Sequence, residues 1–159
     1  MIELKYFDRP DFEQLIDWID SPSFLLQWGG PAFEFPLTTS QLERYMENAN
    51  RKDSETFIYK VIECETHKVI GHISLGKIDR KNRSARIGKV LVGNKHVRGK
   101  GIGQQMIKEI LSIAFDDLHL HRVSLGVFDV RPAWVQSIGC KSRATKAVVV
   151  VSLTQGCPW

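Results

Sequence analysis

The chain has 159 residues, of which 43% are apolar and 25% are charged, and its net charge is +4. This composition is typical of one soluble globular domain with a buried core, and it excludes fibrous, low-complexity and disordered chains. No apolar run approaches the ~20 residues of a transmembrane helix, and the N-terminal residues alternate charge and bulk, unlike a signal peptide. The three cysteines are too few and too widely spaced for a disulfide framework or a zinc cluster, which favours a cytoplasmic protein without a bound metal: Cys64, Cys140 and Cys157.

The first third of the chain predicts a short strand followed by helices. Residues 2–7 are typical of a strand, and apolar residues at helical spacing follow in residues 12–19. A second short helix is expected over residues 23–28, before Gly29 and Gly30. Thr38 precedes a third predicted helix over residues 41–48 and is a good N-cap.

The middle of the chain has a period near two. Residues 56–63, 68–79 and 84–92 predict three strands joined by short polar turns, which is an antiparallel meander. After a glycine-rich turn, residues 102–114 predict an amphipathic helix, and residues 122–128 and 147–153 predict two more strands. The expected fold is a single α/β (α+β) domain with a mixed, mostly antiparallel sheet and helices on both faces.

The turn before the long helix is rich in glycine and in positive charge. Gly99, Gly101 and Gly103 allow a ligand to approach the backbone, and Arg98 and Lys100 add charge. The first amides of the helix have no partner inside the helix, and the helix dipole favours an anion there. This pattern predicts a site for a pyrophosphate.

Two common pyrophosphate motifs do not fit this turn. A P-loop needs Ser or Thr after Gly-Lys, whereas Gly101 follows Lys100 here. A dinucleotide-binding turn follows the first strand of a βαβ unit, whereas this turn follows a meander.

The sequence Arg98-Gly99-Lys100-Gly101-Ile102-Gly103 instead resembles the Arg/Gln-x-x-Gly-x-Gly/Ala signature of the GNAT N-acetyltransferases. The order of elements resembles that family over residues 2–129, and residues 130–159 depart from it. Residues 70–73, 85–88 and 121–123 resemble the branch that acetylates protein N-termini, ribosomal proteins and small amines.

The resemblance implies an acetyl-CoA-dependent transferase acting on a primary amine. It places the cofactor where the strands at 84–92 and 122–128 separate, with the pantetheine along Leu91, Val92 and Gly93. It places the pyrophosphate on the turn and the helix start: Arg98, Gly99, Lys100, Gly101, Ile102 and Gly103. The implied co-substrate is acetyl-CoA, with no metal.

The catalytic groups depart from the family pattern at one strand. Many relatives carry Glu where this chain has Arg86, and a guanidinium cannot act as a base at neutral pH. His72, on the preceding strand and on the face opposite Ile73, is the nearest titratable alternative and our candidate catalytic residue. Asp79 is more typical of a turn, and Glu63 and Glu34 are weaker candidates.

The second departure lies after the last clear strand. The family continues Asn-x-x-Ala-Ile-x-x-Tyr-x-Lys-x-Gly-Phe, in which Tyr is the usual general acid, but residues 129–141 of this chain carry neither the Asn nor the Tyr. A shifted reading frame allows Gly-Ala-Ile-Asp-Arg-Leu-Gln-Lys-Ala-Gly-Tyr, which restores part of the family spacing. The tail is therefore either a natural divergence or a frameshifted terminus.

Two other functions remain open at this stage. The first is a non-catalytic acyl-CoA-binding protein with an impaired active site. The second is a nucleic-acid-binding module, which would use cations around one hairpin: Lys77, Arg80, Lys81, Arg83, Arg86 and Lys89. A solvated charged hairpin explains these residues better, because no aromatic residues interleave with them. The amine substrate and the oligomeric state, including a possible homodimer, are not fixed by the sequence.

Overall fold

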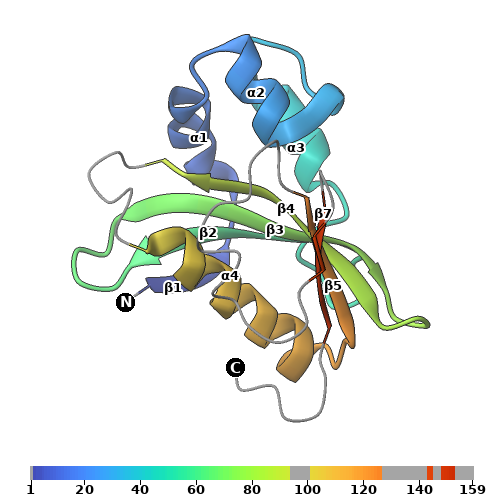
Figure 1. Cartoon of the computed structure of the whole chain (residues 1–159). Helices are drawn as coiled ribbons and strands as arrows, with labels where there is room; N and C mark the ends of the chain where they lie inside the picture. The colour runs from blue at the N-terminus through green and yellow to red at the C-terminus, as the bar shows by residue number, and fades with distance from the viewer. Residues whose placement is uncertain (1, 94–100, 127–142, 145–147, 153–159) are drawn as a thin grey trace.

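The computed structural model describes residues 2–93, 101–126, 143–144 and 148–152. Its centre is a seven-stranded sheet with the order β1-β2-β3-β4-β5-β7-β6 (Figure 1). The strands are β1 Ile2–Tyr6, β2 Phe57–Glu63, β3 Val69–Asp79, β4 Ser84–Val92, β5 Arg122–Gly126, β6 Arg143–Ala144 and β7 Val148–Ser152.

The pairing in this sheet is antiparallel except at one junction. β2, β3 and β4 form the expected meander, and β1 pairs antiparallel with β2. β4 and β5 are parallel, because the chain crosses the sheet through the long helix between them. β7 pairs antiparallel with β5, which confirms the apolar strand predicted in residues 147–153. The prediction of a mixed, mostly antiparallel sheet is therefore confirmed.

Helices cover both faces of the sheet, as predicted (Figure 1). One face carries α1 Phe12–Trp18, α2 Pro22–Gly29 and α3 Thr39–Met46, with 3-10 turns at Arg9–Asp11 and Gly30–Ala32. Ser21 and Thr38 cap α2 and α3, accepting from the amides of Phe24 (3.1 Å) and Gln41 (3.4 Å). The other face carries α4 Ile102–Ser112, which continues into one π-helical turn over Ile113–Asp117.

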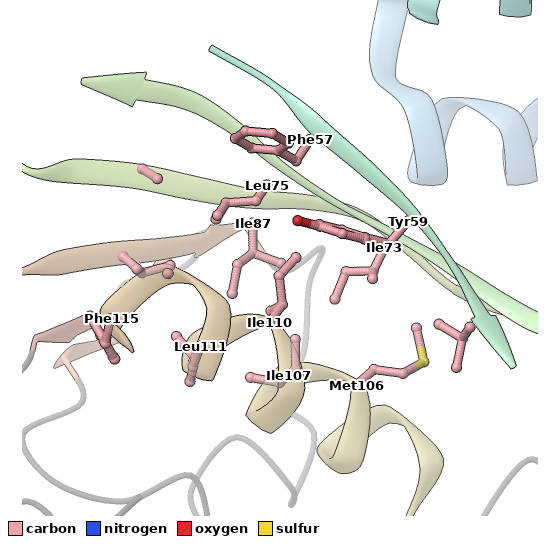
Figure 2. Close-up of a cluster of buried hydrophobic side chains, with 14 of the residues drawn as sticks. Phe57, Tyr59, Ile73, Leu75, Ile87, Met106, Ile107, Ile110, Leu111 and Phe115 are labelled. Carbon is pink, nitrogen blue, oxygen red and sulfur yellow. The ribbon is translucent and has the colours of Figure 1, made fainter. Parts of the chain in front are cut away.

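Each face of the sheet has its own hydrophobic core. Figure 2 shows the core under α4, where Met106, Ile107 and Ile110 point towards the strands. The second core lies between the sheet and α1–α3 and includes Leu15 and Leu42. β3 is central and buried from both sides, so residues 70–75 are all buried.

Truncation in the α4 core should strongly destabilise the fold. The Ile110 side chain is fully buried, so Ile110→Ala removes buried carbon atoms and leaves a cavity. We expect a loss of about 2–5 kcal/mol in the free energy of unfolding. Urea unfolding checks this, with Glu109→Ala on the exposed side of the same helix as the control. An equal, small effect of the two substitutions would contradict this packing.

Candidate active site

β4 and β5 pair through a short parallel ladder. Ser84 pairs with Arg122 and Ile87 pairs with Leu125, where the recorded pairing ends. β4 continues to Val92, whereas β5 is described only as far as Gly126. The family resemblance places the splay along this second half of β4.

A β-bulge lies in the second half of β4. Ser74 of β3 pairs with Gly88, but His72 pairs with Leu91, so Lys89 and Val90 together face one residue of β3. Lys89 has a φ of 53°, which is unusual for a residue other than glycine. The indole Nε1 of Trp28 donates to the Lys89 carbonyl oxygen at 3.0 Å, which fixes the bulge to α2.

The start of α4 offers open space over the backbone. Gly101, the N-cap residue, has a φ of 77°, and a Cβ added there would have no neighbour within 4 Å. Ile102 is buried and anchors the first turn to the core, and Gly103 follows it within the helix. Bare backbone at a helix start therefore leaves room for an anion, as the glycine pattern predicts. Arg98, Gly99 and Lys100 lie outside the described residues.

The predicted pantetheine residues sit at the end of β4. Leu91 is buried in the core under α1–α3. Val92 pairs with Gly71 of β3, and the Gly93 amide donates to the Ile70 carbonyl at 2.9 Å. The Gly93 amide is therefore directed into the sheet. The ring of Trp18 lies so close to Gly93 that an added Cβ would come within 2.1 Å of it.

A pocket of about 770 Å³ opens beside the second half of β4. The segment from α2 to α3 forms most of its wall, and Lys89 enters it from the sheet: Pro31, Ala32, Phe33, Glu34, Phe35, Pro36, Thr38, Gln41, Arg44, Tyr45 and Lys89. The amide of Gln41 bonds to the backbone of Glu34 in both directions, at 2.8 and 3.0 Å, which holds the loop against α3. The pocket and this half of β4 thus share one residue, Lys89.

His72 lies behind this pocket, inside the second core. Its side chain is 1% exposed, and its ring packs edge-on against Phe7 at 4.7 Å and beside Trp28 at 5.4 Å. Its Nε2 is 3.1 Å from the hydroxyl of Tyr45, and its Nδ1 has no hydrogen-bond partner among the described residues. Burial, and then the nearby charge of Lys89, lower the pKa of His72 to about 3, so it is neutral at pH 7.

The buried state of His72 predicts a pH dependence of stability. The pKa of His72 is depressed in the folded chain, so the unfolded chain binds a proton below about pH 6.5 that the folded chain does not bind. Stability should therefore fall as the pH drops below this value, by up to about 1.4 kcal/mol per pH unit. Urea unfolding at pH 7 and pH 5 measures the loss.

The control for this prediction is a second histidine. His72→Gln should remove most of the pH dependence, whereas substitution of the exposed His67 by Gln should leave it unchanged. If His72→Gln keeps the pH dependence of the original chain, His72 is not the buried neutral group that causes it.

The other candidates of the sequence analysis have ordinary surroundings. Asp79 accepts from the amide and side chain of Asn82 at 3.0 and 2.7 Å, as a turn residue does. Arg80 donates to the Lys52 and Ser54 carbonyls, so this cation of the charged hairpin is used to hold a neighbouring loop. Arg86 is exposed.

A comparison with known protein families supports the resemblance that the order of the elements and the glycine turn indicate. A model of the acetyltransferase (GNAT) domain matches residues 2–129. The chain belongs to the GNAT family. It is an acetyl-CoA-dependent N-acetyltransferase of this type, with acetyl-CoA as co-substrate. In the described part of this GNAT domain, no helix is long and apolar enough to span a membrane, and no group of three or more His, Cys, Asp or Glu residues could hold a metal ion.

Several solved structures share the fold at low sequence identity. Spermidine N-acetyltransferase from Vibrio cholerae, in complex with CoA and spermine, has a TM-score of 0.75 at 19% identity and covers 95% of both chains. A dodecameric structure of that enzyme in an intermediate state has a TM-score of 0.70 at 18% identity, covering 95% of this chain and 93% of that one. A domain from Methanocaldococcus jannaschii has a TM-score of 0.69 at 15% identity, with 96% and 99% covered.

Sequence reasoning missed the role of Lys89 in this GNAT domain. It grouped Lys89 with the cations of the hairpin, whereas the structure places it in the pocket beside Phe33 and Tyr45. A strict period of two along β4 gives no signal of the bulge. The helical pattern of residues 41–48 gives no signal of the contact between Tyr45 and His72, because that contact depends on tertiary packing.

Proposed function

We propose that this chain transfers the acetyl group of acetyl-CoA to a primary amine of a protein N-terminus, a ribosomal protein or a small molecule in the cytoplasm. The observation that best supports this function is the pocket that opens beside the second half of β4, next to the place of the expected splay. A thioester along the splayed strand and an amine in the pocket would meet at Lys89, the residue common to both. Membership of the GNAT family supports the choice of acetyl-CoA.

The residues at the start of α4 fit the pyrophosphate of CoA. The open space over Gly101 is a place that a side chain would fill, and it lies at the start of α4, where the first backbone amides have no partner inside the helix. We propose that Gly101, Ile102 and Gly103 bind the pyrophosphate there, with Arg98, Gly99 and Lys100 completing the site. We also propose that Leu91, Val92 and Gly93 border the pantetheine.

The reaction moves one acetyl group and releases one proton. The bound thioester supplies an activated acyl carbon. The acceptor ammonium loses a first proton, and its nitrogen bonds to that carbon and loses a second proton. The carbon–sulfur bond breaks, and the thiolate leaves with the bonding pair and takes up the equivalent of that second proton. The products are an N-acetyl amide and CoA, and the first proton lost by the ammonium is the one released. Side chains that orient the amine and give the thiolate its proton accelerate this step.

His72 enters this proposal as a positioning residue. A group with a pKa near 3 is a poor base towards an ammonium at neutral pH. Its Nε2 instead holds the hydroxyl of Tyr45, which lines the pocket. Burial raises the pKa of Tyr45, so the phenol stays protonated and can donate a hydrogen bond.

An acetyl-transfer assay tests the proposed function. The purified chain, acetyl-CoA and a panel of amines and peptides should give N-acetylated products by mass spectrometry and free CoA thiol in equal amounts. CoA binding by calorimetry without any product would favour the non-catalytic CoA-binding alternative. The absence of both CoA binding and N-acetylated product would contradict the proposal.

A further inference from the structure

Lys89 places a positive charge in the pocket where we propose that an amine acceptor binds. Its backbone is fixed by the bulge and by Trp28, and its ammonium lies 5.1 Å from the ring centroid of Tyr45 and 6.0 Å from that of Phe33. Contacts with aromatic faces partly stabilise a cation. They leave it able to bind an anion from the pocket side.

No carboxylate pairs with Lys89 among the described residues. The carboxylates in ion pairs there belong to Glu3, Asp8, Asp11 and Glu43, which bind other cations. Burial first, and then the like charges of Lys77 and Arg86, lower the pKa of Lys89. The positive charge of Lys89 is thus poorly compensated, and a bound anion would stabilise it.

The other charges of the pocket do not reverse its sign. Arg44 adds a second cation, and Glu34 is the one carboxylate among the lining residues. Glu34 lies on an exposed loop, whereas Lys89 is half-buried on the sheet. A polyamine brings several positive charges and would face two cations here, whereas an acceptor with a carboxylate would find a partner.

We propose that the acceptor of this enzyme is a primary amine that also carries a carboxylate, as an amino acid or an acidic peptide does, and that Lys89 binds this carboxylate. The inference rests on the proposed function, because it names the substrate class of the same pocket. Lys89 acts as the specificity-determining residue, and the amine lies in the same pocket of about 770 Å³.

Matched acceptors test this specificity. The first pair is glycylglycine and glycylglycine amide. The second pair is the dipeptide amides of Gly-Glu and Gly-Gln, and spermidine is the polycationic acceptor. The member of each pair with the carboxylate should have a kcat/KM about 10- to 100-fold higher, which is typical for one charge-assisted contact. Equal values in both pairs, or a preference for spermidine, would overturn the proposal.

Charge variants of Lys89 test the residue itself. Lys89→Met keeps a long side chain against the rings and should abolish the preference, and Lys89→Glu should reverse it in favour of spermidine. Lys68→Glu makes the same charge change in the exposed turn between β2 and β3 and should leave the preference unchanged. Thermal unfolding of each variant shows that it is folded. A preference unchanged in folded Lys89→Met would assign the selectivity to another group.

A binding measurement separates this inference from the proposed function. N-acetylglycylglycine and its amide serve as ligands whose binding can be measured without catalysis. The indole N–H of Trp28 reports on the bulge because it donates a hydrogen bond to the Lys89 carbonyl. The acid should shift the Trp28 indole NMR signal and the amide should not, with the effect lost in Lys89→Met. No acetylation of any amine, with this shift present, would contradict only the proposed function. Acetylation without the shift would contradict only the carboxylate site.

Discussion

Gly101→Asn should weaken CoA binding by about 10- to 150-fold, the value of one lost charge-assisted contact. Asn tolerates a positive φ better than most residues, so the N-cap of α4 should keep its conformation. The new side chain would then occupy the open space over the backbone, where we propose that the pyrophosphate binds. Isothermal titration calorimetry with CoA measures the change.

Two further variants make this result specific. His67→Asn places the same residue at another position of positive φ, in the turn between β2 and β3, and should not change CoA affinity. Arg98→Ala should weaken binding less than Gly101→Asn, because the backbone amides remain. Unchanged CoA affinity in a folded Gly101→Asn variant would contradict the assignment of the pyrophosphate site.

Acetyl transfer by this chain should be slow, about 10²- to 10⁴-fold below the usual enzyme range of ~1–10³ per second. The physical reason is the missing family Tyr, which leaves the departing thiolate without its usual proton donor. CoA binding should be retained, because the glycine turn is intact. Single-turnover measurements of CoA release with saturating amine determine the rate. Residues 130–142, where the family pattern is lost, lie outside the described residues.

A chain carrying the shifted frame from codon 130 should be more stable to heat and should turn over faster if the terminus is frameshifted. A natural divergence predicts neither gain. A rate of the original chain within the usual enzyme range would show that another group supplies the proton. Tyr45→Phe would then test Tyr45, a pocket residue whose phenol is protonated and lies beside His72. A normal rate in Tyr45→Phe would exclude it.

The order of the elements could be predicted from the sequence, because it depends on local patterns. The alternation in residues 84–92 gave the bounds of β4, and the apolar spacing after Ile102 gave α4. Thr38 marked the start of α3 through its capping hydroxyl, whereas the capping role of Ser21 at α2 appears only in the structure. The glycine turn predicts an anion site because glycines let a ligand approach the backbone at a helix start, and this effect depends only on neighbouring residues.

The environment of His72 was decided by tertiary structure. The sequence placed His72 on the face opposite Ile73, which the two separate cores confirm. It did not show that the packing of α1–α3 buries His72 there, because the covering residues lie far away in the chain. That covering excludes water and makes His72 neutral.

The sequence by itself thus determined the helices, the glycine turn and the strands other than β6 of this GNAT domain, and tertiary structure decided which side chains meet in the pocket. β4 shows the reason. A strict alternation would put Ile87, Lys89 and Leu91 on one face, but the bulge at Lys89 adds a residue, so Ile87 packs under α4 and Leu91 under α1–α3. The bulge depends on the partner strand and on the indole of Trp28, neither of which the pattern of β4 contains.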